Sequence, residues 1–230
     1  MIEDKTVLTV EQPPIVALKP WPWVDAVVYY EDEYVRLYHG DARVLLPTMS
    51  TGSVDLVLTD PPYGIGFEHK LLGNVFGDDK VQDITFLLLF GTKHIIWGGH
   101  HFSNQFPSQS RWLMWLKHDP GLFSKRDHGS FDLAWTDLGG SVRAYKHIWD
   151  GSIREGDEYG TVSLHPTQKP LSLMKWCIEM VNGSVCDPFM GSGTTLRAAK
   201  DLGRKSIGIE IEEKYCEIAA RRLSQEVLNL

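Results

Sequence analysis

The stretch Ser184–Thr195, with the sequence SVCDPFMGSGTT, decides the fold of this chain. It opens with apolar residues typical of a buried strand, and a helical pattern begins at Thr194. Between them lies the loop Asp187-Pro188-Phe189-Met190-Gly191-Ser192-Gly193. Glycines in such a loop let the backbone approach a ligand closely, and the helix N-terminus favours a carboxylate or a phosphate. The segment therefore predicts a strand, a ligand-binding loop and a helix.

A second acid supports a ligand at this loop. Glu210 lies nineteen residues after Gly191 and ends the next apolar run. An acid at this distance from a glycine-rich loop binds the hydroxyls of a ribose. Thr194 and Thr195 occupy the place where a dinucleotide fingerprint has its third glycine. Loop and acid together predict an adenosine-containing ligand, and the alternative is an ordinary tight turn between strand and helix.

Outward from this segment, apolar runs alternate with helical patterns. Strands are predicted at 35–41, 54–60, 93–99, 111–117, 131–136, 184–189 and 205–211, and helices at 171–181, 194–203 and 212–227. The segment 42–49 is expected to be a short helix or turn, and the glycine-rich segment 137–164 a mobile loop. Alternation of this kind predicts an α/β fold with a mostly parallel sheet.

Length and composition fit one domain. The chain has 230 residues, a net charge of −7 and three cysteines, which form no C-x-x-C pair. We expect reduced thiols, no signal peptide and a cytoplasmic location. The apolar run FLLLF at 86–90 is far too short to span a membrane. Residues 1–34 predict an N-terminal arm, and residues 35–228 a single domain.

The second motif is Asp60-Pro61-Pro62-Tyr63-Gly64, at the end of the predicted strand 54–60. The prolines lack an N–H group and cannot continue a strand or helix in the usual way. The motif thus presents a carboxylate, backbone carbonyls and an aromatic ring at one point. These groups suit an exocyclic amine on a planar base, because acceptors can take its two hydrogens while the ring stacks. The alternative is an exit turn with Tyr63 packed in the core.

Together, the two motifs resemble those of the S-adenosylmethionine-dependent DNA amino-methyltransferases, which carry a D/N/S-P-P-Y tetrad and an F-x-G-x-G loop. Here the tetrad precedes the loop, which is the circularly permuted order of the beta group. Further matching segments are HGD (39–41), HPTQKP (165–170) and IGIEIEEKY (207–215). The resemblance covers roughly 35–228 and is strongest to short, phage-encoded adenine-N6 enzymes. It implies a permuted Rossmann-like class I methyltransferase fold with one antiparallel strand and helices on both faces of the sheet.

The resemblance also implies roles for individual residues. The tetrad Asp60, Pro61, Pro62 and Tyr63 would be catalytic. Asp41 would bind the cofactor adenine, Glu210 the ribose, and Thr167 and Lys169 the cofactor carboxylate. The remaining residues expected at the cofactor belong to the loop: Asp187, Phe189, Gly191, Gly193 and Thr194. His100 and His101 are adjacent with no further ligand pair at metal spacing, so we expect no metal site.

The implied function is transfer of a methyl group from S-adenosylmethionine to the N6 amine of an adenine flipped out of duplex DNA. Two alternatives stay open: methylation of cytosine N4, and a non-catalytic nucleotide-binding protein. An RNA or protein methyltransferase is disfavoured, because those relatives usually carry Asn in the tetrad and the opposite motif order. A homodimer and a cognate restriction endonuclease are further partners that the resemblance suggests.

Charge localises the expected DNA surface. The net charge is −5 over residues 1–33 and zero over 34–154, so contacts with phosphates should lie in the middle segment. We expect a small target-recognition region within about 66–83 and 103–160. Its phosphate-binding candidates are Lys70, Lys80, Arg111, Lys117, Lys125, Arg126, Arg143 and Lys146.

Overall fold

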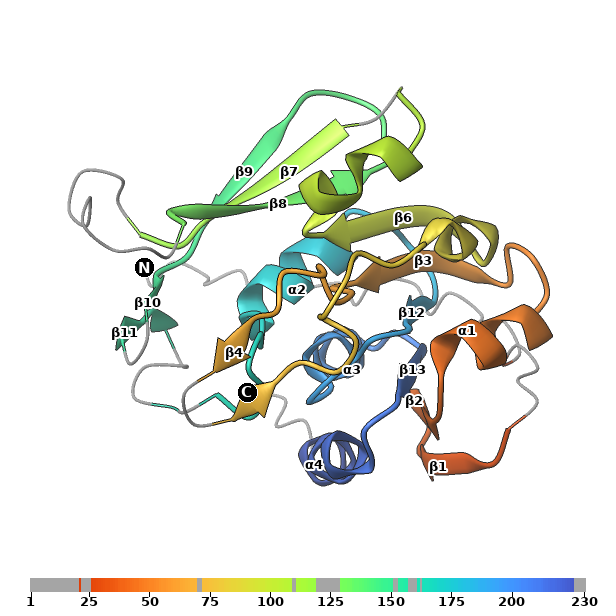
Figure 1. Ribbon diagram of the computed structural model, residues 1–230. Coiled ribbons are helices and arrows are strands. Elements are labelled where there is room, and N and C mark those ends of the chain that lie inside the picture. Colours follow the sequence, from red (N-terminus) through yellow and green to blue (C-terminus); the bar gives the residue numbers. More distant parts are fainter. Residues whose placement is uncertain are drawn as a thin grey trace, which may run out of the picture.

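The computed structural model describes residues 21, 26–69, 72–108, 111–118, 129–150, 153–156, 161 and 163–225. Within them, nine strands form one sheet with the order β1-β2-β13-β12-β3-β6-β8-β7-β9 (Figure 1). The strands are β1 (Val28–Glu31), β2 (Val35–His39), β3 (Val54–Thr59), β6 (Gly91–Trp97), β7 (Arg111–Leu116), β8 (Phe131–Thr136), β9 (Arg143–Lys146), β12 (Val185–Asp187) and β13 (Ser206–Glu210). Two small hairpins pair β4 (Glu68–His69) with β5 (Gly73–Asn74) and β10 (Trp149–Asp150) with β11 (Ile153–Arg154).

The centre of the sheet is parallel, as predicted. Strands β2, β13, β12, β3 and β6 run in one direction. The sheet has two antiparallel strands and not the single one expected, because β1 and β8 both run against their neighbours. The sheet thus gains an antiparallel strand within 1–34, the range predicted to be an arm, because the turn at Asp32 folds β1 back onto β2.

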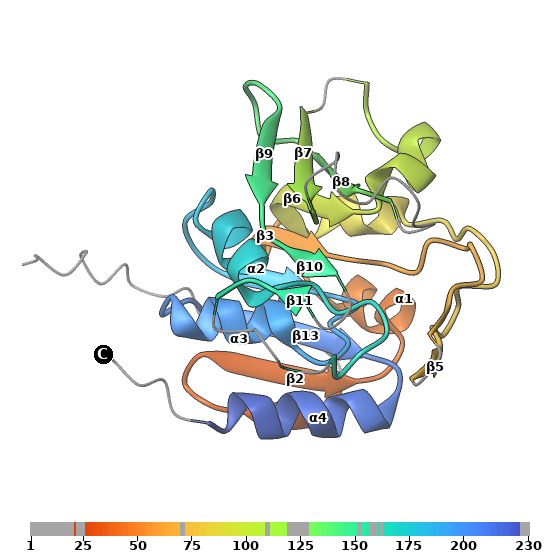
Figure 2. The same cartoon turned by 90° about the vertical axis from the view of Figure 1, so that its left-hand side faces the viewer.

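Helices cover both faces of the sheet, as predicted (Figure 2). On one face lie α2 (Leu171–Ile178), α3 (Thr194–Asp201) and α4 (Glu213–Leu223). On the other lie α1 (Ala42–Leu45) and the 3-10 turns η1 (Leu46–Thr48), η2 (Thr85–Leu89) and η3 (Gly99–Gln105). Alternate residues of a strand enter opposite layers: Leu56 and Leu58 pack with α2, whereas Val57 packs with α1 and η1. None of the helices in the described residues is long and apolar enough to cross a membrane.

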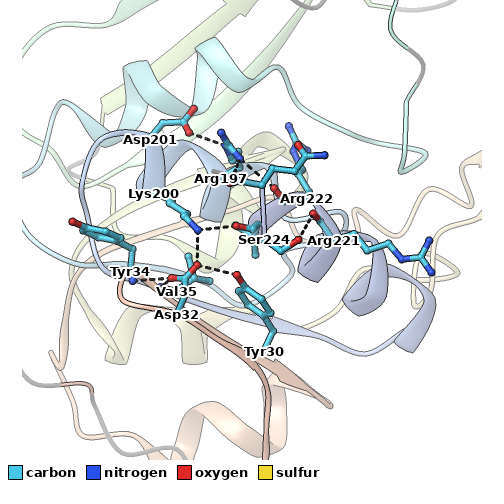
Figure 3. A network of polar contacts seen from close by, with 12 residues as sticks. Tyr30, Asp32, Tyr34, Val35, Arg197, Lys200, Asp201, Arg221, Arg222 and Ser224 are labelled. Atoms are coloured by element: carbon cyan, nitrogen blue, oxygen red, sulfur yellow. Dashed lines mark hydrogen bonds and ion pairs between the residues drawn. The ribbon is translucent and has the colours of Figure 1, made fainter. Parts of the chain in front are cut away.

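A polar network fixes α3 to the β1–β2 turn (Figure 3). The Asp32 carboxylate accepts hydrogen bonds from the backbone N–H groups of Tyr34 and Val35, both at 2.8 Å. Its second oxygen accepts from the Tyr30 hydroxyl at 3.0 Å and from the Lys200 ammonium of α3 at 2.6 Å. The network anchors the edge of the sheet to the helix that follows the glycine-rich loop.

The segment 137–164 is more ordered than the predicted loop. Its described residues include β9, which joins the main sheet beside β7, and the β10–β11 hairpin. The sequence of β9, RAYK, lacks the apolar run that marks the other strands. Its strand conformation therefore depends on backbone pairing with β7. The predicted arm residues 1–20 and 22–25, as well as Lys70, Lys125 and Arg126, lie outside the described residues.

Parallel pairing brings the ends of distant segments together. Asp187 of β12 pairs with Gly208 of β13, and Glu210 pairs with His39 of β2. β12 also pairs with β3, which leads directly into Asp60. Open α/β sheets bind ligands at the carboxyl ends of such strands, where the strand order reverses. The two motifs from opposite halves of the sequence therefore meet at one edge of the sheet.

Candidate active site

Two adjoining cavities occupy this edge. The larger has a volume of about 560 Å³ and is lined by Asp60, Pro61, Pro62 and Tyr63 and by Asp41, Phe189 and Glu210. The smaller, of about 40 Å³, is lined by Asp187, Gly191 and Thr194 of the loop. Asp60, Thr167 and Lys169 line both cavities. The structure thus brings every predicted site residue except Gly193 to a cavity wall.

Gly193 serves the packing of the helices behind the loop. Its φ of +77° favours glycine, and a Cβ atom there would lie 2.9 Å from the Cβ of Ala219 in α4. The missing side chain lets α4 approach the start of α3.

Asp60 is the polar centre of the site. Its carboxylate accepts a short hydrogen bond from the Tyr63 hydroxyl and forms a short ion pair with the Lys169 ammonium. The side chains are only 16% exposed for Asp60 and 8% exposed for Lys169. Lys169 Nζ also lies 3.3 Å from the Tyr63 hydroxyl oxygen. The resemblance implied that Lys169 lies near the cofactor carboxylate, and the structure places its ammonium against Asp60.

The ring of Tyr63 is held from several sides. His101 stacks on it with the ring centroids 4.8 Å apart and an interplanar angle of 19°. A Cβ atom on Gly98, whose φ is +67°, would lie 1.9 Å from Tyr63 Cε1. Burial and the neighbouring Asp60 carboxylate raise the pKa of Tyr63 well above its usual value. The phenol therefore stays protonated and acts as a donor to Asp60.

Asp187 is buried behind the loop. Its carboxylate accepts hydrogen bonds from the Thr59 hydroxyl at 2.7 Å and from the Phe189 backbone N–H at 3.2 Å. Burial raises its pKa to about 6. Because Thr59 directly precedes Asp60, this carboxylate links the loop to the strand that carries the tetrad.

Glu210 shapes the loop from the neighbouring strand. One carboxylate oxygen accepts from the Gly191 N–H at 2.9 Å, and the other accepts from the Glu212 N–H at 2.8 Å. Burial raises the pKa of Glu210. An ionised carboxylate has about four lone-pair positions, so these two bonds leave acceptor capacity for a hydroxyl group of a ligand.

His165 lines both cavities. Its ring lies against Gly191, where a Cβ atom would meet His165 Cδ2 at 3.0 Å. The ring also packs edge-on against Tyr215, with centroids 4.4 Å apart. Burial lowers the pKa of His165 to about 4, so the ring is neutral near pH 7.

Asp41 also lines the larger cavity. It caps α1 by accepting from the Arg43 backbone N–H at 2.9 Å. The Arg43 guanidinium also donates to both of its carboxylate oxygens, which holds the pKa of Asp41 below its usual value. Asp41 is therefore ionised and held in place at the cavity wall.

One wall of the larger cavity is formed by Trp115, Lys117 and Asp132, which the sequence motifs do not predict as site residues. The Lys117 ammonium pairs with Asp132 at 2.8 Å and lies 5.2 Å from the Trp115 ring centroid. Burial raises the pKa of Asp132, but the charges of Lys169 and Lys117 outweigh it and lower the pKa. One signal was available, since Asp132 is the only acid in the apolar run 131–136.

Two of the predicted phosphate-binding residues are not free surface groups. Arg111 is buried within β7, with only 8% of its surface exposed. Lys117 pairs with Asp132 inside the cavity. Lys80, Arg143 and Lys146 are exposed, as binding to phosphates would require.

Comparisons with known proteins agree on one family. A model of the DNA methylase family matches residues 125–221. The type II methyltransferase M2.DpnII of Streptococcus pneumoniae is 43% identical over 250 residues, which cover 86% of this chain and 92% of that protein. The DNA adenine methyltransferase YhdJ of Escherichia coli (strain K12) is 29% identical over 251 residues, which cover 84% of each.

Solved structures share the fold. The M1.HpyAVI–SAM complex has a TM-score of 0.52 at 24% identity and covers 83% of this chain and 100% of that chain. The cytosine-N4-specific PvuII DNA methyltransferase has a TM-score of 0.58 at 16% identity and covers 90% of this chain and 92% of that chain.

Fold and site together define a class I methyltransferase in which the tetrad precedes the glycine-rich loop. The chain belongs to the DNA methylase family, and within it to the beta group of amino-methyltransferases. Its cofactor is S-adenosylmethionine.

Proposed function

We propose that this DNA methyltransferase transfers a methyl group to the N6 amine of an adenine that has been rotated out of duplex DNA. The observation that carries the proposal is the position of the Asp60 carboxylate beside the Tyr63 ring, in the wall shared by the two cavities. Asp at the first tetrad position favours adenine, since cytosine-N4 relatives usually carry Ser there.

The residues present fit the cofactor. A volume of about 560 Å³ lies within the range of small-molecule sites, roughly 300–1,000 Å³. Glu210 offers a buried carboxylate for the ribose hydroxyls, and Asp41 a carboxylate for the adenine amine. Phe189, Gly191 and Thr194, with Thr167, would surround the methionine part. Bound S-adenosylmethionine supplies an electrophilic methyl group.

Asp60 supplies the chemistry on the side of the base. The lone pair of an adenine amine is delocalised into the ring and is a poor nucleophile. Hydrogen bonds from the amine to the Asp60 carboxylate and the Pro61 carbonyl favour a pyramidal nitrogen whose lone pair is free. The carboxylate also stabilises the positive charge that develops on nitrogen, and it can accept the proton that leaves.

No covalent intermediate with a cysteine is needed. Cys177, Cys186 and Cys216 are all buried, and burial raises the pKa of each thiol. A buried, protonated thiol is a poor nucleophile. The methyl group that S-adenosylmethionine would supply could therefore pass straight to the amine as its bond to sulfur breaks, with Asp60 taking the amine proton.

The amine of a paired base is inaccessible to these groups, so the base must leave the helix. Tyr63 is the stacking platform in this proposal. In this proposal an extruded base stacks on the part of the Tyr63 ring that lines the larger cavity. The exposed Lys80, Arg143 and Lys146 would contact the DNA backbone.

Nucleoside analysis of methylated DNA tests the proposal. Duplex DNA is incubated with the protein and radiolabelled S-adenosylmethionine, and the product is digested to nucleosides. We expect the label in N6-methyldeoxyadenosine. Label in N4-methyldeoxycytidine would establish the alternative base, and absence of label would refute DNA methylation. The same DNA, sequenced with methylation-sensitive chemistry, gives the recognition site.

The biological setting is also part of the proposal. Several relatives are type II methyltransferases, and by analogy with them a cognate restriction endonuclease is an expected partner. A cytoplasmic location is also expected, because it suits three free cysteines. A homodimer is the expected assembly of a beta-group enzyme. Sedimentation of the protein with and without DNA measures the assembly directly.

A further inference from the structure

The ion pair between Asp60 and Lys169 places a hydrogen-bond acceptor and a donor side by side in the wall of the larger cavity. An ammonium group carries three donor hydrogens. Here one is directed to Asp60, and the Tyr63 hydroxyl oxygen lies 3.3 Å away as a second partner. Because Lys169 is only 8% exposed, its remaining donor capacity faces cavities and not open solvent.

The position of the ammonium leaves room for a base on Tyr63. Lys169 Nζ lies 3.3 Å from the hydroxyl oxygen but 5.7 Å from the ring centroid. It therefore lies beyond the hydroxyl end of the ring and not over its face. A base stacked on the face would present an edge to Asp60 and Lys169 together.

We propose that Lys169 reads the ring nitrogen next to the target amine, while Asp60 accepts a hydrogen from the amine itself. The inference rests on the proposed function and extends it to base selection. In adenine, a donor (N6) and an acceptor (N1) are neighbours, and cytosine has the same pair in N4 and N3. Asp60 and Lys169 are the complementary acceptor and donor. Guanine and thymine carry the opposite pattern, an oxygen beside a ring N–H, and leave both protein groups unpaired.

Lys169 also interacts with a second carboxylate, that of Asp132. The positive charge of Lys169 also acts on Asp132 and lowers its pKa. Lys169 therefore lies in the field of two carboxylates, which compensate its charge inside a buried site. Lys117 provides a natural comparison, because it is the other lysine of the cavity and pairs with Asp132 instead of Asp60.

Deaza bases test the inference without altering the protein. The target adenine is replaced by 1-deazaadenine, which keeps the amine but lacks N1, or by 7-deazaadenine, which keeps both. Each is placed opposite an abasic site, so that base pairing does not differ between them. We expect wild-type protein to methylate 1-deazaadenine about 5- to 100-fold more slowly than 7-deazaadenine in single turnovers, the effect of one unpaired donor. Equal rates would overturn the inference.

The same two analogues are then compared in the variant Lys169→Met, which completes a cycle of protein and base changes. Without the ammonium, the rate ratio between the two analogues should fall to about one, whatever the absolute rates are. Lys117→Met should keep the wild-type ratio, and Lys169→Arg should restore part of it. If Lys169→Met keeps the wild-type ratio between the rates on 7-deazaadenine and 1-deazaadenine, the inference is overturned.

The proposed function fails separately, by absence of methylation on unmodified adenine. If cytosine is the substrate instead, 3-deazacytosine replaces 1-deazaadenine in the same cycle. The expected ratios are then unchanged.

Discussion

Lys169 and Asp60 form a largely buried ion pair that joins segments 109 residues apart in the sequence. Lys169 belongs to the segment before α2, whereas Asp60 follows β3. The pair therefore fixes the segment 165–170 against the tetrad and aligns the two cavities that both residues line. Its two charges compensate each other inside the fold.

The first prediction concerns the stability of this pair. Removing one partner leaves an uncompensated charge in a poorly solvated position, which typically costs about 3–5 kcal/mol. Lys169→Met alone and Asp60→Asn alone should each lower the free energy of unfolding. The double variant should lose less than the sum of the two, because no unpaired charge remains. Urea denaturation gives the free energy of unfolding of the wild type, the two single variants and the double variant. Strictly additive losses of this free energy would contradict the coupling.

A second prediction concerns cofactor binding. Glu210→Ala removes the carboxylate expected to hold the ribose hydroxyls. A hydrogen bond to a charged group contributes about 1.5–3 kcal/mol, so affinity for S-adenosylmethionine should fall by about one to two orders of magnitude. Ligand at 100 times the wild-type Kd stabilises the wild type by about 2.7 kcal/mol, and the same concentration should stabilise the variant by only about 0.4–1.4 kcal/mol, so the shift in Tm should fall by about half or more. A stabilising response to NAD in place of S-adenosylmethionine would reject the cofactor assignment.

The third prediction separates a steric effect from backbone strain. Gly98→Ala places a Cβ atom 1.9 Å from Tyr63 Cε1, at a φ of +67°. Gly203→Ala has nearly the same φ, +64°, but a Cβ atom there meets nothing within 4 Å. Both variants should lose about 1–2 kcal/mol from the left-handed backbone. Only Gly98→Ala should also lose methyl transfer, and comparable activity in the two would show that the Tyr63 position is unimportant.

The fourth prediction follows from the raised pKa of Asp187. Burial favours the protonated form in the folded state, with a pKa of about 6 against an ordinary value of 3.8. The contribution to stability is therefore fully present below pH 3.8 and is lost as the pH rises through about 6. At about 1.4 kcal/mol per pKa unit, the loss is about 3 kcal/mol.

Asp187→Asn tests this linkage, since its amide oxygen can still accept from Thr59 but does not ionise. The unfolding free energy of wild type relative to Asp187→Asn should fall between pH 4 and pH 8. A difference between the two proteins that stays constant over this range would argue against a raised pKa.

Much of this site follows from local sequence patterns. The loop 187–195, Glu210 and the tetrad 60–63 were each predicted to bind a ligand at the end of a strand, and parallel pairing brings these ends to one edge of the sheet. Strands with continuous apolar runs, such as β3 and β13, were predicted nearly to the residue for the same reason.

Features that depend on tertiary contacts escaped prediction. β9 is a strand because β7 offers a partner, and no periodicity in 143–146 reveals it. The pairing of Lys169 with Asp60 is set by the approach of two distant segments, so a resemblance placed Lys169 only near the cofactor. Likewise, the sequence predicts Lys117 as a surface cation, and only the fold shows that Asp132 of β8 lies beside it.

The most direct test of the central claim separates binding from chemistry at Asp60. Single-turnover methyl transfer to duplex DNA is measured for wild type and Asp60→Ala, together with the affinity of each for S-adenosylmethionine. We predict that Asp60→Ala binds the cofactor within a few-fold of wild type but transfers the methyl group about 10²–10³ times more slowly, as expected for loss of one charge-stabilising group. Methylation by Asp60→Ala at the wild-type rate would contradict the assignment of the tetrad as the catalytic site.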